Sequence, residues 1–414
     1  MNTKTTPYRW FILLLLVLGT AVLNYSNIIF AVRATDIMDS YHCNATQLAA
    51  IVSISSLPGA LLSVFFGRIL DKTGCKKIMS VFILLTAVVF YLRTVVNSYW
   101  ALFVLTLLAG IFLVPTGVAP AKVLYSWFDE KEMPVAMGIY ASSAGFGSAI
   151  GYATSTLFPQ VKGSLMLVTL IAAGLFLLWA LFGKNAPDAA AETRPAEEKA
   201  DSAVLKALLK SRNLWILMIC SFIASGVSLT LNTYLSRALE FKGGADGAAA
   251  VAVIGSVLNI CMVLGAAVVG ALISKLQLFN KPFLVLCVVG SGMLLVAWFI
   301  PFGVVTYIAF PLAALLLSGA VGLNMTRITL LPMTGDLTPD TIATANGLCN
   351  MALSLGAFIL PIVVSAIAGE KYVIVFVTAF LLFVFSGIIG TRVPELGARG
   401  ELYRSLHSGS SEQS

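Results

Sequence analysis

The stretch YVIVFVTAFLLFVFSGII, from Tyr372 to Ile389, decides the fold class of this chain. It carries no charged residue over a length close to the roughly 20 residues with which a helix crosses the hydrocarbon core of a membrane. A second apolar run extends from Phe11 to Leu23, and similar runs recur along the sequence. Water cannot cover so much apolar surface, so the pattern indicates an integral membrane protein built of helices.

The composition agrees with this interpretation. Hydrophobic residues make up 59% of the 414 residues and charged residues 11%, whereas a soluble domain has about 25% charged residues. The six cysteines form no C-x-x-C motif, so no disulfide framework, metal site or cofactor is expected.

The net charge of +7 would suggest a nucleic-acid partner in a soluble protein, but the basic residues gather in the N-terminus and the even-numbered connections between apolar runs. This positive-inside bias places both termini in the cytoplasm and excludes nucleic acid as the explanation of the charge. Membrane lipid is the expected environment. The short connections and the lack of an organellar signal fit a bacterial inner membrane.

Prolines, glycines and charged clusters divide the chain into twelve predicted spans. They lie near residues 10–33, 46–66, 77–96, 99–124, 134–158, 164–183, 213–236, 247–273, 282–300, 303–330, 340–366 and 372–391. The predicted organisation is an N-terminal six-helix bundle over 1–183, a cytoplasmic linker over 184–212, a C-terminal six-helix bundle over 213–391 and a cytoplasmic tail over 392–414.

The two halves resemble each other weakly. Leu108 to Gly110 leads to Ala136 to Ile139 at the same spacing as Leu317 to Gly319 leads to Ala345 to Leu348. A second match pairs the sequence RATD from Arg33 with RALE from Arg237. These matches predict two pseudo-symmetric bundles around a central cavity.

The connection between the second and third spans carries the most specific motif, GRILDKTGCKK from Gly67 to Lys77. Two glycines permit a tight turn between helices, and one carboxylate remains among basic residues. The motif resembles the signature of the major facilitator superfamily, although Leu70 and Cys75 replace a usual small and a usual basic residue. The resemblance implies that this turn latches the two halves; fixing topology alone is the other interpretation. The gating candidates here are Gly67, Asp71, Lys72, Gly74 and Lys76.

After the fourth span, the run from Tyr125 to Glu132 and the small residues Ala136, Gly138 and Ala144 to Gly147 resemble the organic-anion branches of that superfamily, which include monocarboxylate, cyanate, nitrate and anion-cation symporters. Close helix packing is the simpler role of these small residues. The anion-cation branch has a charged pair in its first helix, and this chain has Asn27 and Ile28 there.

Polar residues within predicted spans are functional candidates because they are costly in lipid. The candidates for substrate binding are Asn24, Tyr25, Asn27, Asn324, Arg327, Asn346 and Asn350. Asn24 with Asn27, Asn324 with Arg327, and Asn346 with Asn350 are each three or four residues apart, so each pair is expected to share a helix face. Hydrogen bonds that only join helices are the alternative.

Arg327 is predicted to lie in the inner half of its span, where a guanidinium needs an anion or water. No acidic residue lies deep in any predicted span, so we expect transport by anion exchange. Snorkelling of Arg327 to the cytoplasmic surface is the alternative.

Arg33 and Arg237 occupy equivalent outer ends of spans and are each followed three residues later by an acid. An outer gate and local ion pairs are both compatible with this spacing. Arg93 is set aside, because the third helix does not line the cavity in the superfamily.

The sequence thus predicts an all-α integral membrane protein with twelve transmembrane helices, acting as a secondary active transporter of a small anion, with a carboxylate favoured. It contains no motif for ATP or for a catalytic metal, so we expect no enzymatic activity, and we expect a monomer. The alternatives are an exporter of neutral or amphiphilic compounds and a non-transporting membrane sensor on the same fold.

Overall fold

The computed structural model describes residues 7–73, 75–128, 133–154, 157–158, 160–184, 208–276, 278–331, 342–369 and 371–395, and every regular element in them is helical. The helices are α1 (Tyr8–Val32), α2 (Ala34–Tyr41), α3 (Ala45–Ile54), α4 (Leu57–Thr73), α5 (Cys75–Val95), α6 (Tyr99–Trp127), α7 (Met133–Thr154), α8 (Val161–Phe182), α10 (Arg212–Leu276), α11 (Asn280–Phe299), α12 (Val304–Leu330), α13 (Ile342–Ala368) and α14 (Tyr372–Gly390). The predicted all-α class is confirmed.

Within the described residues, ten helices are long and apolar enough to cross a membrane. One of them, α10, contains 65 residues, which at 1.5 Å per residue gives about 98 Å, more than three times the thickness of a hydrocarbon core. The helix is interrupted at Gly244, whose φ of 57° and ψ of −131° are not helical. We therefore describe α10 as two spans joined at Gly244, as the sequence predicts.

The chain forms two compact units, and α10 contributes to both. The first unit contains Met1–Pro195 and Asn232–Ser256, and the second contains Ala196–Leu231 and Val257–Ser414. Residues 185–207 of the predicted linker lie outside the described residues.

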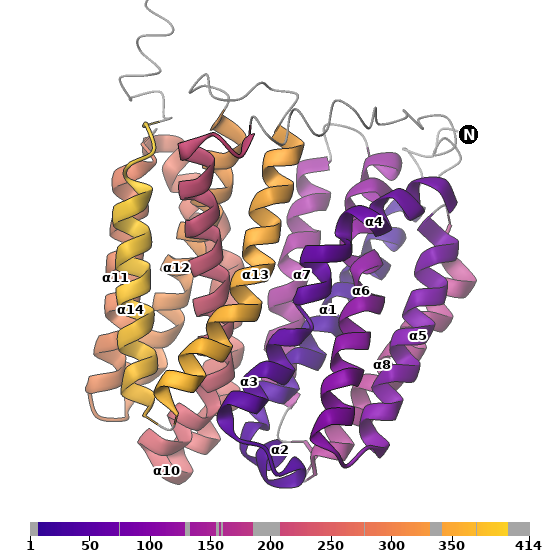
Figure 1. Cartoon of the computed structure of the whole chain (residues 1–414), viewed down its shortest axis with the longest axis horizontal. Coiled ribbons are helices and arrows are strands. Elements are labelled where there is room, and N and C mark those ends of the chain that lie inside the picture. Colours follow the sequence, from indigo (N-terminus) through magenta and orange to yellow (C-terminus); the bar gives the residue numbers. More distant parts are fainter. Residues whose placement is uncertain are drawn as a thin grey trace, which may run out of the picture. The chain divides into compact units, whose positions relative to one another are not determined.

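In the first unit, α1 packs most extensively against α7, and Figure 1 shows the two helices side by side. Their backbones come so close that a Cβ atom on Gly147 would lie 2.2 Å from the carbonyl oxygen of Ala21. The predicted use of small residues for close packing is confirmed at this position.

In the second unit, α11 packs against α12 and α14 (Figure 1), and the first span of α10 meets α13. A Cβ atom on Gly356 of α13 would lie 2.0 Å from the carbonyl oxygen of Phe222 in α10. Gly147 and Gly356 are separated by the same interval as Gly110 and Gly319.

Gly110 and Gly319 also occupy equivalent packing positions. A Cβ atom on Gly110 of α6 would lie 2.7 Å from the carbonyl oxygen of Ser55, between α3 and α4, and one on Gly319 of α12 would lie 2.3 Å from the side chain of Val269 in α10. The repeat seen in the sequence is therefore present in the packing of each unit.

Two local features were not predicted. The span near 46–66 is interrupted after Ile54, so that it consists of α3 and α4. Asn44 begins α3 with a reciprocal cap, in which its side chain accepts from the backbone N–H of Gln47 at 2.8 Å and its own N–H donates to the Gln47 side chain at 2.9 Å. The short helix α2 is the other feature, and it ends at His42 in the left-handed region.

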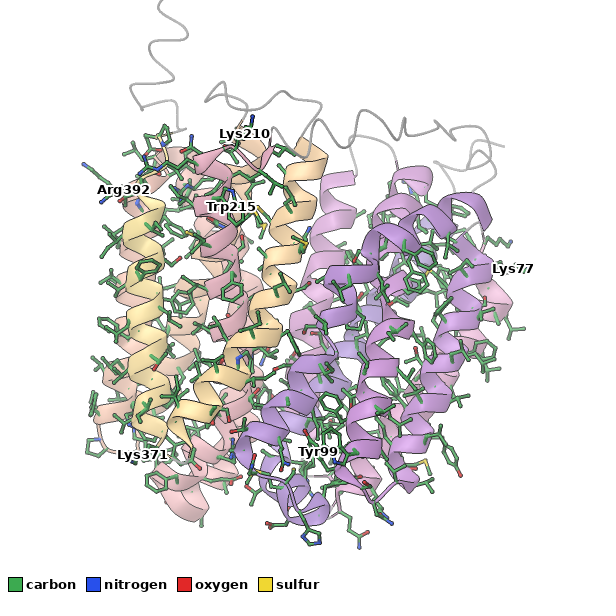
Figure 2. All side chains as sticks on the ribbon, viewed as in Figure 1. Lys77, Tyr99, Lys210, Trp215, Lys371 and Arg392 are labelled. Atoms are coloured by element: carbon green, nitrogen blue, oxygen red, sulfur yellow. The ribbon has the colours of Figure 1, made fainter. Side chains whose placement is uncertain are left out.

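Basic residues and a tyrosine mark the ends of the apolar spans in the two units (Figure 2). In the second unit, Lys210 and Arg392 lie at one end and Lys371 lies at the opposite end. In the first unit, Lys77 and Tyr99 lie towards opposite ends of α5 and α6. This arrangement fits helices that cross a membrane with polar flanks.

Candidate functional site

The polar stretch of α1 makes its main polar contacts with α7. The Tyr25 hydroxyl lies 2.9 Å from that of Thr154, and the Thr20 hydroxyl donates to that of Tyr140 at 3.2 Å. Asn24 donates to the carbonyl of Thr20, one turn earlier on its own helix, at 2.9 Å. The contact between α1 and α7 therefore contains a row of hydroxyl and amide groups.

Asn27 differs from its neighbours on α1. Its side chain is partly exposed and forms no hydrogen bond with the described residues. An amide in this state offers two donors and an acceptor to a ligand. The amide nitrogen of Asn24 donates to the Thr20 carbonyl within α1, and Asn24 and Asn27 are not hydrogen-bonded to each other.

The opposite side of α1 contacts Arg93 of α5, which the sequence analysis set aside. Arg93 is 2% exposed and donates from Nη1 to the hydroxyl of Ser26 at 3.2 Å. Its guanidinium stacks on Phe30 at 5.4 Å and on Phe90 at 4.9 Å. A single arginine in an apolar span was the signal that could have identified this buried contact.

In the second unit, Asn324 and Arg327 of α12 contact different neighbours. Asn324 is 3% exposed and donates to the carbonyl of Leu217 at 3.2 Å and to the hydroxyl of Ser221 at 3.0 Å, both in α10. Its side-chain oxygen has no hydrogen-bond partner among the described residues. Asn324 and Arg327, which were predicted to share a helix face, therefore have different hydrogen-bond partners.

Arg327 is fully buried and is held by α11 and α14. Its Nη2 atom donates to the carbonyl of Gly390 and to the side-chain oxygen of Asn280, the latter at 3.1 Å. Its guanidinium lies 4.9 Å from the ring of Phe283. The Nε and Nη1 atoms have no partner among the described residues.

Glu395, which the sequence analysis placed in the tail, completes this network. Its carboxylate accepts from the backbone N–H groups of Phe279 at 2.7 Å and Asn280 at 2.9 Å, where the positive end of the α11 dipole favours an anion. Asn280 also donates to the carbonyl of Val393 at 2.7 Å. The network joins α11, α12 and the segment that follows α14.

The remaining substrate candidates lie on α13. Asn350 is exposed, and the side chain of Asn346 lies outside the described residues. Their shared face therefore stays a prediction.

For the motif from Gly67 to Lys77, the structure describes mainly the course of the backbone. The helix α4 ends at Thr73 and α5 begins at Cys75. The carbonyl of Lys76 accepts from the indole N–H of Trp179 at 3.3 Å. Gly74 and the side chains of Asp71 and Lys72 lie outside the described residues, so the proposed latch stays a prediction.

Arg33 and Arg237, which occupy equivalent ends of their spans, form different contacts. Arg33 forms the expected ion pair with Asp36 at 2.9 Å. Arg237 forms no such pair with Glu240 within the described part of the chain; it donates to the sulfur of Met38 at 3.4 Å and stacks on Tyr234 at 4.7 Å. The local ion pair is thus confirmed at Arg33 and wrong at Arg237.

Known proteins share sequence with this chain. The galacturonate transporter of Dickeya chrysanthemi is 23% identical over 252 residues, which are 56% of this chain and 72% of that protein. The hexuronate transporter of Escherichia coli K12 is 24% identical over 181 residues, which are 43% of this chain and 41% of that protein. With the uncharacterized transporter YybO of Bacillus subtilis, at 28% identity, the match covers 34% of this chain and only 33% of that protein.

Solved structures share the fold. A bacterial homologue of the human lysosomal transporter Spinster, in an inward-facing and occupied conformation, is 14% identical with a TM-score of 0.77 over 94% of this chain and 97% of that chain. The nucleoside transporter NupG is 14% identical with a TM-score of 0.72 over 94% of this chain and 98% of that one. These likenesses concern the fold alone.

The family model agrees with both comparisons and with the predicted resemblance. It matches residues 14–361, which include most of the spans of both halves and the motif after the second span. Transport through a membrane, and not catalysis, is the activity of this family and of the relatives. The chain belongs to the Major Facilitator Superfamily.

Proposed function

We propose that this protein is a secondary active transporter for a small carboxylate of the sugar-acid class, working by alternating access of its two halves. The observation that carries this proposal is the function of its relatives, because the galacturonate transporter matches over 72% of its own length. Other relatives are described as galactarate/D-glucarate and hexuronate transporters.

The α1–α7 contact supports a polyhydroxylated substrate. Asn27 is partly exposed and makes no hydrogen bond with the described residues, while Thr20, Tyr25 and Tyr140 provide hydroxyl groups nearby on the two helices. Amides and hydroxyls both donate and accept, so they suit the hydroxyl groups of a sugar acid. We propose Asn24, Tyr25 and Asn27 as contacts to these hydroxyl groups.

The protein group that binds the carboxylate of the substrate is considered separately from the groups that bind its hydroxyls. Two nitrogen atoms of Arg327 have no hydrogen-bond partner within the described part of the chain, which is compatible with carboxylate binding, but its other contacts join α12 to α11 and α14. The contacts therefore favour a structural role, and Arg327→Gln separates the two roles, because loss of a structural contact lowers stability whereas loss of a ligand contact weakens substrate binding.

We further propose that both termini are cytoplasmic, that the protein resides in a bacterial inner membrane and that it exchanges anions. The exchange proposal depends on Arg327 facing the substrate. No acidic residue lies deep in the predicted spans to neutralise it there, and a carrier that is charged when empty reorients slowly.

Transport into proteoliposomes tests the proposal. Labelled galacturonate and glucuronate should enter saturably, and unlabelled sugar acids should compete. Galactose is the matched control, because it has the hydroxyl groups but no carboxylate. Faster uptake into vesicles loaded with galacturonate would support exchange. Equal competition by galactose would favour a transporter of neutral compounds, and no saturable uptake of any probe would contradict the sugar-acid proposal.

A further inference from the structure

Arg237 lies directly after the first predicted span of α10, in the segment Asn232–Ser256 of the first unit, and its guanidinium is buried with few partners. The residue is 5% exposed, yet its Nε and Nη2 atoms have no hydrogen-bond partner among the described residues. Within the described part of the chain its side chain makes one hydrogen bond, from Nη1 to the weak acceptor Sδ of Met38 at 3.4 Å. A buried cation is costly unless an anion pairs with it.

The two nitrogen atoms of Arg237 without a partner lie along one edge of its guanidinium. In this planar group the N–H bond of Nε is parallel to one N–H bond of Nη2, and the two form the fork that donates two hydrogen bonds to a single carboxylate. Nη1, which contacts Met38, lies on the other side of the group. The fork that recognises a carboxylate is therefore complete, and the contact with Met38 does not use it.

Arg327 differs from Arg237 in this respect. Its Nη2 atom donates to Gly390 and Asn280, so the atoms without a partner among the described residues are Nε and Nη1. These two nitrogen atoms do not share an edge, and a carboxylate cannot accept from both in parallel. The fork of Arg327 is thus already occupied by its structural contacts.

Arg93 is the third deeply buried arginine among the described residues, and it is held more firmly than Arg237. Its Nη1 atom donates to the hydroxyl of Ser26 at 3.2 Å, and its guanidinium lies 5.4 Å and 4.9 Å from the rings of Phe30 and Phe90. Arg237 has a sulfur atom in place of the hydroxyl and one ring, that of Tyr234 at 4.7 Å, in place of two.

The segment that carries Arg237 is fixed to α1 close to the candidate substrate contacts. The hydroxyl of the fully buried Ser236 donates to the carbonyl of Ala31 at 2.6 Å. Asn27 precedes Ala31 by four residues, which is about 6 Å along the helix axis, so the two residues share a face of α1. Arg237 is thereby held within about a helical turn of the stretch of α1 that contains Asn27.

We propose that the edge of Arg237 formed by Nε and Nη2 binds the carboxylate of the transported sugar acid, while Asn27 and its neighbours on α1 bind the hydroxyl groups. This assignment rests on the proposed function and adds the carboxylate contact to it. One carboxylate oxygen accepts from Nε and the other from Nη2. The anion neutralises a charge that is unpaired in the empty carrier, so exchange is expected with Arg237 as well as with Arg327 as the charged group.

The edge of Arg237 is buried in the structure, so a neighbouring element has to move before a carboxylate can enter. The short helix α2 contacts Arg237 through Met38, and this hydrogen bond to sulfur is weak. The stronger bond from Ser236 to Ala31 holds the segment of Arg237 on α1. Movement of α2, with Arg237 staying in place, is therefore the expected route of entry.

The experiment compares galacturonate with its methyl ester, which has the same hydroxyl groups but no negative charge. Each unlabelled compound inhibits the uptake of labelled galacturonate into proteoliposomes that contain the full-length protein. The ratio of the two inhibition constants measures the contribution of the carboxylate, and it does not depend on the amount of active protein. The variants are Arg237→Gln, Arg237→Lys and the control Lys242→Gln, which removes a positive charge from the same connection.

In wild type, galacturonate should inhibit about tenfold more strongly than its ester, or better, as expected for hydrogen bonds between charged groups. In Arg237→Gln the ratio should fall to near one and the half-saturation concentration should rise, because an amide has no charge and no fork. Arg237→Lys should keep part of the preference, since the charge remains without the fork. Lys242→Gln should keep the wild-type ratio. A residue that only joined α10 to α2 would change the melting temperature and leave the ratio unaltered.

A wild-type ratio in Arg237→Gln would overturn the assignment. If that variant does not fold, as judged by its melting temperature, Arg237→Lys decides, and an unchanged ratio there rejects the fork. An equal loss of preference in Lys242→Gln would also reject it, because general attraction by positive charge would then explain the preference. Absence of saturable galacturonate uptake by wild type would contradict the sugar-acid proposal together with the assignment, so the two failures are distinguishable.

Discussion

Arg327 donates a hydrogen bond of 3.1 Å to Asn280, and Asn280 is also the residue at which Glu395 caps α11. One buried guanidinium is thereby connected to α11 and to the segment after α14. This relationship changes what mutations at Arg327 are expected to show.

The first prediction is that Arg327→Gln and Asn280→Ala both lower the melting temperature of the purified protein. Each variant removes part of the same buried network, and leaving buried donors or acceptors without partners costs about 1–3 kcal/mol. Thermal unfolding in detergent measures the change. If Arg327→Gln instead keeps the wild-type melting temperature while the half-saturation concentration for galacturonate rises, Arg327 binds the carboxylate and the structural role is wrong.

The second prediction concerns the motif after the second span. Asp71→Asn should leave the protein inserted but slow uptake several-fold, because the carboxylate is proposed to latch the two halves. Asp39→Asn, which removes an exposed acid on α2, is the matched control and should transport normally. Unchanged turnover of Asp71→Asn at equal membrane abundance would contradict the latch.

The third prediction tests the repeated helix packing. Gly147→Ala and Gly356→Ala should each destabilise the protein by about 1–3 kcal/mol, because the added Cβ would meet the backbone at 2.2 Å and 2.0 Å. Gly117→Ala makes the same change in α6 at a position where the added Cβ would meet no neighbouring group of the described residues within 4 Å, and it should be tolerated. A similar melting temperature for all three variants would show that the close approaches are not required.

The fourth prediction concerns cysteine labelling. Cys43 should be labelled from the outside and Cys75 from the cytoplasmic side, as the predicted orientation requires. Because burial raises the pKa of the Cys43 thiol, its thiolate fraction at neutral pH is lower than that of a free cysteine, and the labelling rate should increase about tenfold per pH unit below that pKa. Labelling of Cys75 from the outside would reverse the orientation.

Hydropathy located the apolar spans, since the apolar length of each span is a local property of the chain, but it indicated neither the short helix α2 nor the interruption between α3 and α4. The sequence also predicted separate spans over 213–236 and 247–273, and Gly244, where the helix is interrupted, lies between them. The spacing of Gly110 and Gly319 indicated the repeat that the packing contains.

The partners of the polar residues required the tertiary structure. Asn324 and Arg327 are three residues apart, yet one contacts α10 and the other contacts α11 and α14. RATD and RALE are similar sequences, yet of these two arginines the described structure shows an ion pair with the following acid at Arg33 and a contact with Met38 at Arg237. A side chain's partner depends on the rotation and depth of its helix relative to helices that are distant in sequence, and the spacing of residues along one helix contains no information about either.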